Sequence, residues 1–131
     1  MAIRLITTNE EYETEYPRVR GWLIEAQLKA GKEDAERDIL AGLLSGGYRL
    51  WVGDNCAAIT ENMEWDGRPV CVVVLAGGDL REIVSDGIPV ITQAAKAQHC
   101  DGILLFGRPG WQRVLEPHGF EFSSIVMFKE F

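Results

Sequence analysis

The middle of the chain carries a nearly unbroken apolar run, PVCVVVL, over residues 69–75. A run of this kind predicts a strand that is buried on both faces, because a strand with one wet face would alternate polar and apolar side chains. Just before it, Asp66-Gly67 is typical of a tight hairpin turn, and residues 55–64 form another extended segment. The sequence therefore predicts a hairpin whose second arm is the central strand of a sheet.

Helices and further strands are predicted on both sides of this hairpin. Two helical segments, residues 17–30 and 33–45, end at Gly31 and at Gly46-Gly47, where glycine favours a helix C-terminus. A longer helical face runs over residues 80–98, and Pro89 predicts a kink or break near residues 85–89 because proline lacks a backbone donor. Residues 9–11 read as an acidic turn. Short strands are expected at residues 3–7, 48–52 and 103–106, a short helix at 109–115, and one or two strands within 120–131.

This order of elements predicts an α/β fold with a mixed, mostly antiparallel central sheet flanked by helices. A chain of 131 residues suits one hydrophobic core, and 47% hydrophobic with 25% charged residues is an ordinary globular composition. No linker or repeat divides the sequence, so residues 1–131 are expected to form a single domain.

Charge and hydropathy exclude several classes of partner. The net charge of −7 disfavours nucleic acid and anionic lipid, which would repel the protein. No apolar run approaches the roughly 20 residues that cross a bilayer, and the first residues turn acidic before a signal-peptide core develops, so a cytoplasmic protein without membrane contact is expected. The cysteines Cys56, Cys71 and Cys100 are widely spaced and expected to be reduced, and no metal site is expected, since His99, Cys100 and His118 match no ligand spacing.

The order of elements over the whole chain resembles the GNAT superfamily of N-acetyltransferases. In the second half, an alanine-rich helix ends at Cys100, a strand follows, and the segment GRPGWQR (107–113) precedes Gly119-Phe120 and a last segment carrying Lys129. This half is similar to small GNAT-like proteins encoded by tailed phages and prophages. The resemblance implies a GNAT-like fold and, if the protein is catalytic, acetyl-CoA as its cofactor.

In this family, a glycine-containing loop between the central strand and the following helix holds the pyrophosphate of acyl-CoA, as the resemblance implies. The matching segment offers Gly77, Gly78 and Arg81 as candidate cofactor-binding residues, and Arg108 lies at the end of a later strand, where sites of α/β proteins gather. The segment lacks the family's leading Arg or Gln and its spacing. Asp79 and Glu82 also form a capping-box pattern, which predicts a helix start that satisfies its own amides.

Catalytic candidates are Glu61, Glu64 and Tyr48. The family often uses a carboxylate on the middle strands as general base, which points to Glu61 or Glu64, although each also fits an exposed strand residue. Many members place a tyrosine as general acid five residues before the phenylalanine of Gly119-Phe120, and this chain has Leu115 there, which cannot donate a proton. Tyr48 is the nearest substitute in chemical type.

Two functions remain open from the sequence, and the first is favoured because both the family's phosphate-loop pattern and its general-acid tyrosine are missing. The first is a GNAT-fold protein with a degenerate acyl-CoA site that acts through contacts with a protein partner or a second copy, in phage assembly or in the virion, and so resides in the host cytoplasm or the virion. The second is an acetyl-CoA-dependent N-acetyltransferase with a non-standard phosphate loop. A capped helix start at Asp79 would favour the first hypothesis, and free amides beside the central strand would favour the second.

Overall fold

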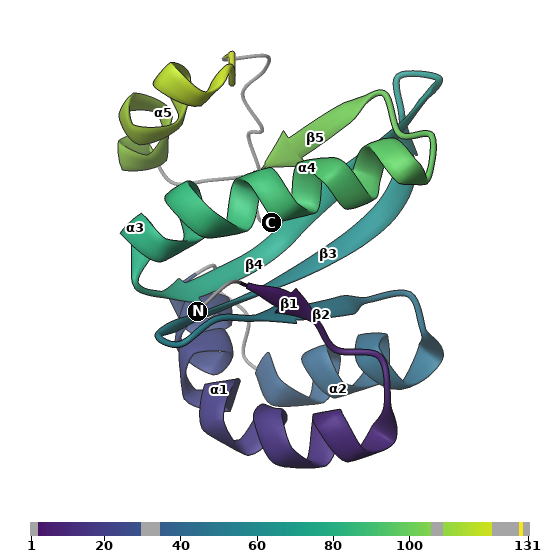
Figure 1. Ribbon diagram of the computed structural model, residues 1–131, viewed down its shortest axis with the longest axis vertical. Helices are drawn as coiled ribbons and strands as arrows, with labels where there is room; N and C mark the ends of the chain where they lie inside the picture. The colour runs from purple at the N-terminus through teal and green to yellow at the C-terminus, as the bar shows by residue number, and fades with distance from the viewer. Residues whose placement is uncertain (1–2, 30–34, 106–108, 122–128, 130–131) are drawn as a thin grey trace.

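The computed structural model describes residues 3–29, 35–105, 109–121 and 129. It is a single α/β domain built on a five-stranded sheet with the strand order β1-β2-β3-β4-β5 (Figure 1). The strands are β1 (Arg4–Leu5), β2 (Arg49–Val52), β3 (Cys56–Trp65), β4 (Arg68–Gly78) and β5 (Gly102–Leu105). The helices are α1 (Asn9–Lys29), α2 (Ala35–Ser45), α3 (Leu80–Glu82), the π-helix η1 (Ile83–Gly87), α4 (Ile88–Ala97), α5 (Pro109–Leu115) and the 3₁₀-helix η2 (Glu116–His118).

The sheet is mixed and mostly antiparallel, as the sequence predicts. Strands β1 to β4 pair antiparallel in chain order, and β5 joins β4 in parallel after the crossover through α4. Strand β4 therefore lies inside the sheet, and Val70, Val72 and Val73 on it are buried. The turn before β4 has Asp66 at φ 53° and Gly67 at φ 77°, the left-handed pair that matches the twist of a two-residue hairpin.

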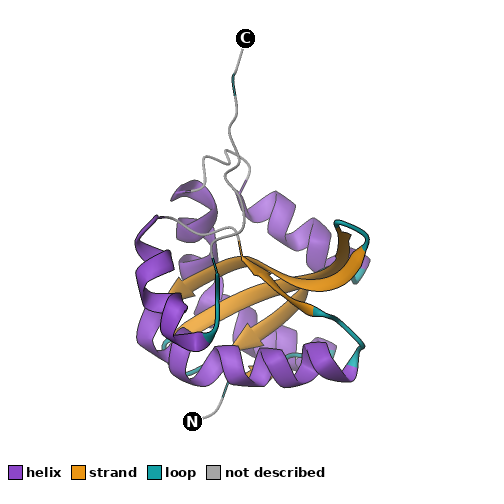
Figure 2. Ribbon diagram, turned by 90° about the horizontal axis from the view of Figure 1, so that it is seen from above, coloured by secondary structure: helices purple, strands orange, loops and turns teal. Residues whose placement is uncertain are grey.

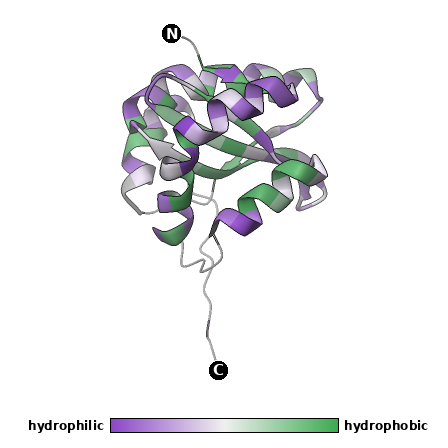
Figure 3. Cartoon of the chain, turned by 90° about the horizontal axis from the view of Figure 1, so that it is seen from below, coloured by the Kyte–Doolittle hydropathy of each residue, from purple (hydrophilic) through white to green (hydrophobic). Residues whose placement is uncertain are grey.

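Helices cover both faces of the sheet and create two apolar clusters. Figure 2 shows helices on both sides of the sheet. Helices α1 and α2 pack on one face, where Val19, Leu23 and Ile39 meet Leu50 and Ile59. The helical segment α3–η1–α4 packs on the other face, where its apolar side chains meet the far side of the same strands (Figures 1 and 3). The buried residues of this second cluster are Ile3, Trp51, Cys56, Ala58, Cys71, Ile83, Ile91 and Ala95.

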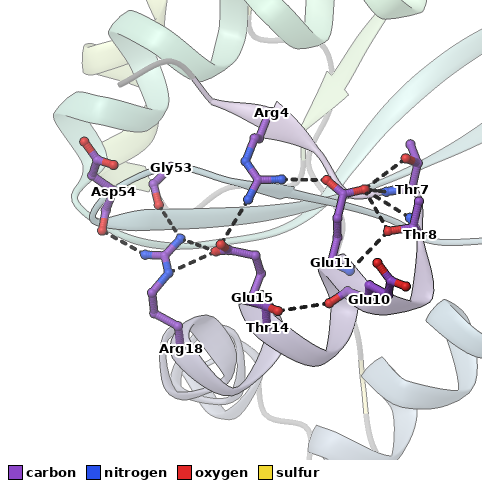
Figure 4. Close-up of polar contacts among 10 residues, drawn as sticks. All are labelled: Arg4, Thr7, Thr8, Glu10, Glu11, Thr14, Glu15, Arg18, Gly53 and Asp54. Atoms are coloured by element: carbon purple, nitrogen blue, oxygen red, sulfur yellow. Dashed lines mark hydrogen bonds and ion pairs between the residues drawn. The ribbon is translucent and has the colours of Figure 1, made fainter.

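Helix α1 begins earlier than the sequence predicts. The residues that read as an acidic turn, including Glu10 and Glu11, form its first turn, and Pro17 lies inside the helix instead of at its start. Thr8 and Glu11 form a capping box: the Glu11 amide donates to the Thr8 hydroxyl at 3.1 Å, and the Thr8 amide donates to the Glu11 carboxylate at 3.2 Å (Figure 4). This reciprocal cap explains why the helix starts there.

Charged side chains fix α1 to the rest of the fold. Arg4 on β1 pairs with Glu11 at 2.8 Å and with Glu15 at 3.0 Å. Arg18 pairs with Glu15 and donates to the carbonyl oxygens of Gly53 and Asp54 at 2.8 and 2.9 Å, in the connection between β2 and β3 (Figure 4). The network therefore fixes α1 against two strand ends on its side of the sheet.

The helix predicted over residues 80–98 is present and changes its winding where proline requires it. It runs as α3, then as the π-helix Ile83–Gly87, then as α4, with Pro89 in the first turn of α4. A residue without an amide hydrogen cannot join the regular ladder, and a wider π turn absorbs the missing bond. The predicted strands within residues 120–131 and the end of β5 at Phe106 lie largely outside the described residues.

None of the described helices is long and apolar enough to cross a membrane.

Candidate functional site

A pocket of about 630 Å³ opens on the face of the sheet that α1 and α2 cover. Its size falls within the range that holds small organic ligands. Among the described residues, the charged lining residues are the acids Asp38 and Glu61, and the others are apolar or neutral. The lining comprises Gln27, Asp38, Ala41, Gly42, Ser45, Gly47, Tyr48, Glu61, Val74 and Leu75.

A β-bulge in the central strand shapes the sheet wall of this pocket. Opposite β3, Ile59 pairs with Leu75 and Thr60 pairs with Val73, so Val74 is an extra residue on β4. Side chains along a regular strand alternate between faces, but the inserted residue lets Val74 and Leu75 both reach the face of α1 and α2. The strand therefore presents two consecutive residues to one pocket, an arrangement that bulges often produce beside active sites.

Two of the three sequence-predicted catalytic candidates, Tyr48 and Glu61, line this same pocket. Tyr48 packs directly on α2, since a Cβ atom added at Gly42 would lie 2.2 Å from its ring. Burial raises the pKa of the Tyr48 hydroxyl, and the negative charges of Glu61 and Asp38 raise it further. The hydroxyl thus stays protonated at neutral pH, and both carboxylates act on it electrostatically.

The third candidate, Glu64, lies elsewhere. Glu61 shares its face of β3 with Ala57 and Ile59, which belong to the cluster under α1 and α2. Glu64 is three residues further along and so projects from the opposite face, exposed and paired with Pro69 near the hairpin turn. The structure therefore brings Glu61 and Tyr48 together and leaves Glu64 out of the pocket.

The start of α3 has the N-cap that the sequence predicts, with a different second partner. The Asp79 carboxylate accepts the backbone N–H of Arg81 at 2.9 Å. Glu82 does not return to Asp79 as a capping box requires. Its carboxylate accepts instead from the Asn55 amide at 3.2 Å and from the Cys56 thiol at 3.1 Å, while the Asp79 amide donates to the Asn55 carbonyl at 2.8 Å. Glu82 thereby ties the helix start to the β2–β3 connection.

The two glycines before this cap allow close backbone packing. A Cβ atom at Gly77 would lie 2.5 Å from the Trp22 carbonyl oxygen of α1, and one at Gly78 would lie 2.3 Å from the Asn55 carbonyl oxygen. Gly78 also has φ 91°, which L-residues with side chains rarely adopt. Both glycines, predicted as cofactor-binding residues, therefore have a structural reason to be glycine.

The remaining candidates differ in what the structure shows of them. The Arg81 side chain is exposed and, in the part of the chain that the structure describes, has no ion pair or hydrogen bond. Arg108 lies outside the described residues. Leu115, at the position where the family resemblance implies a tyrosine, is only 4% exposed and belongs to the core.

Sequence reasoning missed Gln27 and Asp38, which come from α1 and α2. Gln27 is only 7% exposed and is one of two buried polar side chains recorded among the described residues. A glutamine inside a helical pattern carries no signal of its own in the sequence. It stands out only when the structure shows it buried at a pocket wall.

Comparison with known proteins places the fold. The sequence matches no family model, and no curated protein matches it. Among solved structures, a probable acetyltransferase aligns with a TM-score of 0.69 at 14% identity over 99% of each chain. Glucosamine-6-phosphate N-acetyltransferase from Arabidopsis thaliana aligns with a TM-score of 0.62 at 11% identity, over 100% of this chain and 99% of that one.

An aminoglycoside N-acetyltransferase in complex with CoA aligns with a TM-score of 0.68 at 16% identity, over 98% of this chain and 93% of that one. Identities this low show the fold and leave the activity to be argued from the site. The chain has the GNAT acetyltransferase fold, a single α/β domain with a mixed five-stranded sheet flanked by helices.

Proposed function

We propose that this protein is an acetyl-CoA-dependent N-acyltransferase that acts on a small amine. The observation that carries the proposal is the pocket lined by both Glu61 and Tyr48, beside the bulge in β4 that turns Val74 and Leu75 to the same face. A carboxylate and a phenol in one concave site are the groups that acyl transfer to an amine needs. The fold shared with acetyltransferases supports the same reaction.

Glu61 is placed to accept a proton from an ammonium group that enters the pocket, which frees the nitrogen lone pair. The nitrogen then forms a bond to the acyl carbon as the bond between that carbon and sulfur breaks. Tyr48, whose pKa is raised mainly by burial, donates its proton to the departing sulfur, and the new amide nitrogen then returns its second proton to the Tyr48 oxygen. Acetyl-CoA supplies the activated acyl group for this exchange.

The start of α3 is where this chain would hold the pyrophosphate. Arg81 offers an exposed guanidinium that has no other partner within the described part of the chain. A helix start following the central strand also favours an anion, since the first amides point outward. Gly77 and Gly78 keep side chains away from the backbone there. These residues fit the phosphates of the cofactor, although the Asp79 cap takes the amide of Arg81.

Thiol release from acetyl-CoA in the presence of primary amines tests the proposal. We expect wild-type protein to release thiol with the amine as limiting substrate, and Glu61→Gln to lower kcat by about 10²- to 10⁴-fold, the usual contribution of a general base. Glu64→Gln, with the same change of charge on the opposite face of β3, should retain wild-type activity. Equal activity of the two variants would exclude Glu61 as the base.

A second candidate function is a non-catalytic GNAT scaffold that acts through protein contacts, as a phage assembly or virion component. The observation that favours it is the helix start, where Asp79 caps α3. Neighbouring backbone also packs closely against Gly77 and Gly78. Exposed leucines, with Leu44 at 88% and Leu28 at 55% exposure, offer apolar surface to a partner protein or a second copy. This candidate leaves the pocket with Glu61 and Tyr48 unexplained.

A further inference from the structure

The pocket proposed to bind the amine has two carboxylates in its lining, although one amino group needs only one. Its acids come from separate elements, Glu61 from β3 and Asp38 from α2, and no lysine or arginine lies in its described lining. The negative charges of both acids raise the pKa of the Tyr48 hydroxyl, after the larger effect of burial. The nearest cation recorded for Asp38 is its neighbour Arg37, whose Nε atom is 4.0 Å away with a 75% exposed side chain.

Gln27 supplies an independent sign that the pocket binds a ligand. Its side chain is more than nine-tenths buried and lines the pocket. Within the described chain its amide makes no hydrogen bond, and every fully enclosed side-chain nitrogen or oxygen does have a partner. The amide of Gln27 therefore keeps a small accessible surface, and its residue lines the pocket. An amide that has no protein partner and keeps some accessible surface is available to hydrogen-bond a ligand in the pocket.

We propose that the pocket is built for an acceptor with two amino groups, a short diamine, with Asp38 as the residue that selects it. One amino group lies by Glu61 and Val74 and reacts, and the second stays protonated and pairs with Asp38. Gln27 bonds a polar hydrogen of the bound acceptor, and Ala41, Val74 and Leu75 surround its carbon chain. The inference rests on the proposed function, since it names the acceptor of that same site.

The volume and the charge of the site agree with this assignment. A pocket of about 630 Å³ exceeds the need of a single small ammonium group and accommodates a short carbon chain. Two carboxylates, with no cation in the described lining, would repel an anionic acceptor and attract a dication, more strongly at low salt. Asp38 is exposed at 48% of its side chain, so its pairing with an ammonium is worth a modest factor.

Calorimetric titration with 1,4-diaminobutane and with 1-aminobutane tests the inference without any acyl transfer. We expect the diamine to bind about fivefold more tightly, and Asp38→Asn to abolish the difference. Asp66→Asn changes the net charge equally at the hairpin turn, outside the pocket, and should keep the difference. Each titration is repeated with CoA present, so that an acceptor that binds only beside CoA is also detected.

Equal affinity for the two amines, no change in Asp38→Asn, or no binding of either amine with or without CoA would overturn the inference. A second variant, Gln27→Met, separates binding from folding. It should weaken binding of the diamine while the free energy of unfolding stays unchanged or rises, because no protein hydrogen bond is lost. Parallel loss of stability and binding would contradict the role of Gln27. Amine binding that persists without thiol release would refute the transferase and leave the pocket assignment in place.

Discussion

The contact between Gly42 and Tyr48 decides the shape of the pocket at the level of single residues. Gly42 is a helical glycine on α2, where alanine would be preferred by about 1 kcal/mol in an open position. The Tyr48 ring occupies the space a methyl group would need, with the nearest ring atom at 2.2 Å. Glycine at this position therefore lowers the stability of α2 but leaves the space that the Tyr48 ring occupies.

Gly42→Ala should push Tyr48 out of the pocket, lower thiol release by at least about tenfold, and destabilise the fold by about 1–3 kcal/mol through overpacking. Chemical unfolding and the transfer assay measure the two effects. Gly21→Ala on α1 is the matched control, because nothing lies within 4 Å of its added Cβ atom. That variant should gain about 0.5–1 kcal/mol and keep full activity. Activity that survives Gly42→Ala would exclude Tyr48 as the acid.

At the scale of elements, the capping box of α1 links pH to stability. The pKa of Glu11 is lowered from its ordinary value of 4.5, chiefly by the hydrogen bond from the Thr7 backbone amide and then by the Thr7 hydroxyl. A group whose pKa is lowered in the folded state stabilises the fold above its unfolded value, and this contribution is lost as pH falls through the folded value. The start of α1 should therefore weaken below pH 4.5.

Urea unfolding at pH 7 and at about pH 3 measures this effect. In Glu11→Gln the drop in unfolding free energy between the two pH values should be smaller than in the wild type, since the titrating group is gone. Glu13→Gln makes the same charge change on the same helix without a recorded partner in the described chain, and should keep the wild-type drop. Identical drops in all three proteins would show that the Thr7–Glu11 hydrogen bonds do not stabilise α1.

Some boundaries and breaks of the helices and strands could be predicted from local sequence patterns, and others could not. The central strand and the break near Pro89 follow from an apolar run and from a missing amide, and both were predicted. The predicted start of α1 was wrong by eight residues, because Pro17 is typical of a helix start. The true start is indicated by the capping-box spacing of Thr8 and Glu11. The bulge at Val74 could not be predicted from the sequence. A bulge is detected as a shift in the alternation of polar and apolar residues, and every position of this strand is apolar.

For the whole molecule, the sequence predicted the α/β class, the mixed sheet and its flanking helices, because element order and handedness restrict the possible topologies. The site was predicted only in part. Glu61 was proposed from the family resemblance and Tyr48 from its residue type, but their position in one pocket depends on the register between β2, β3 and β4. Asp38 and Gln27 come from helices whose packing no short pattern specifies.

For the whole chain, we propose that a GNAT fold with a modified helix start still binds acetyl-CoA and delivers its acyl group to the pocket under α1 and α2. The Asp79 cap argues against this claim, and the bulge with Glu61 and Tyr48 argues for it. Binding of the cofactor is therefore the property on which the two candidate functions differ most.

The most direct measurement is a calorimetric titration of the purified protein with acetyl-CoA at moderate salt, with CoA alone as comparison and Arg81→Gln as the variant. We expect saturable binding with a Kd on the order of micromolar, which corresponds to about −8 kcal/mol, and clearly weaker binding in Arg81→Gln. No heat up to millimolar acetyl-CoA would rule out the transferase and leave a GNAT scaffold that acts through protein contacts.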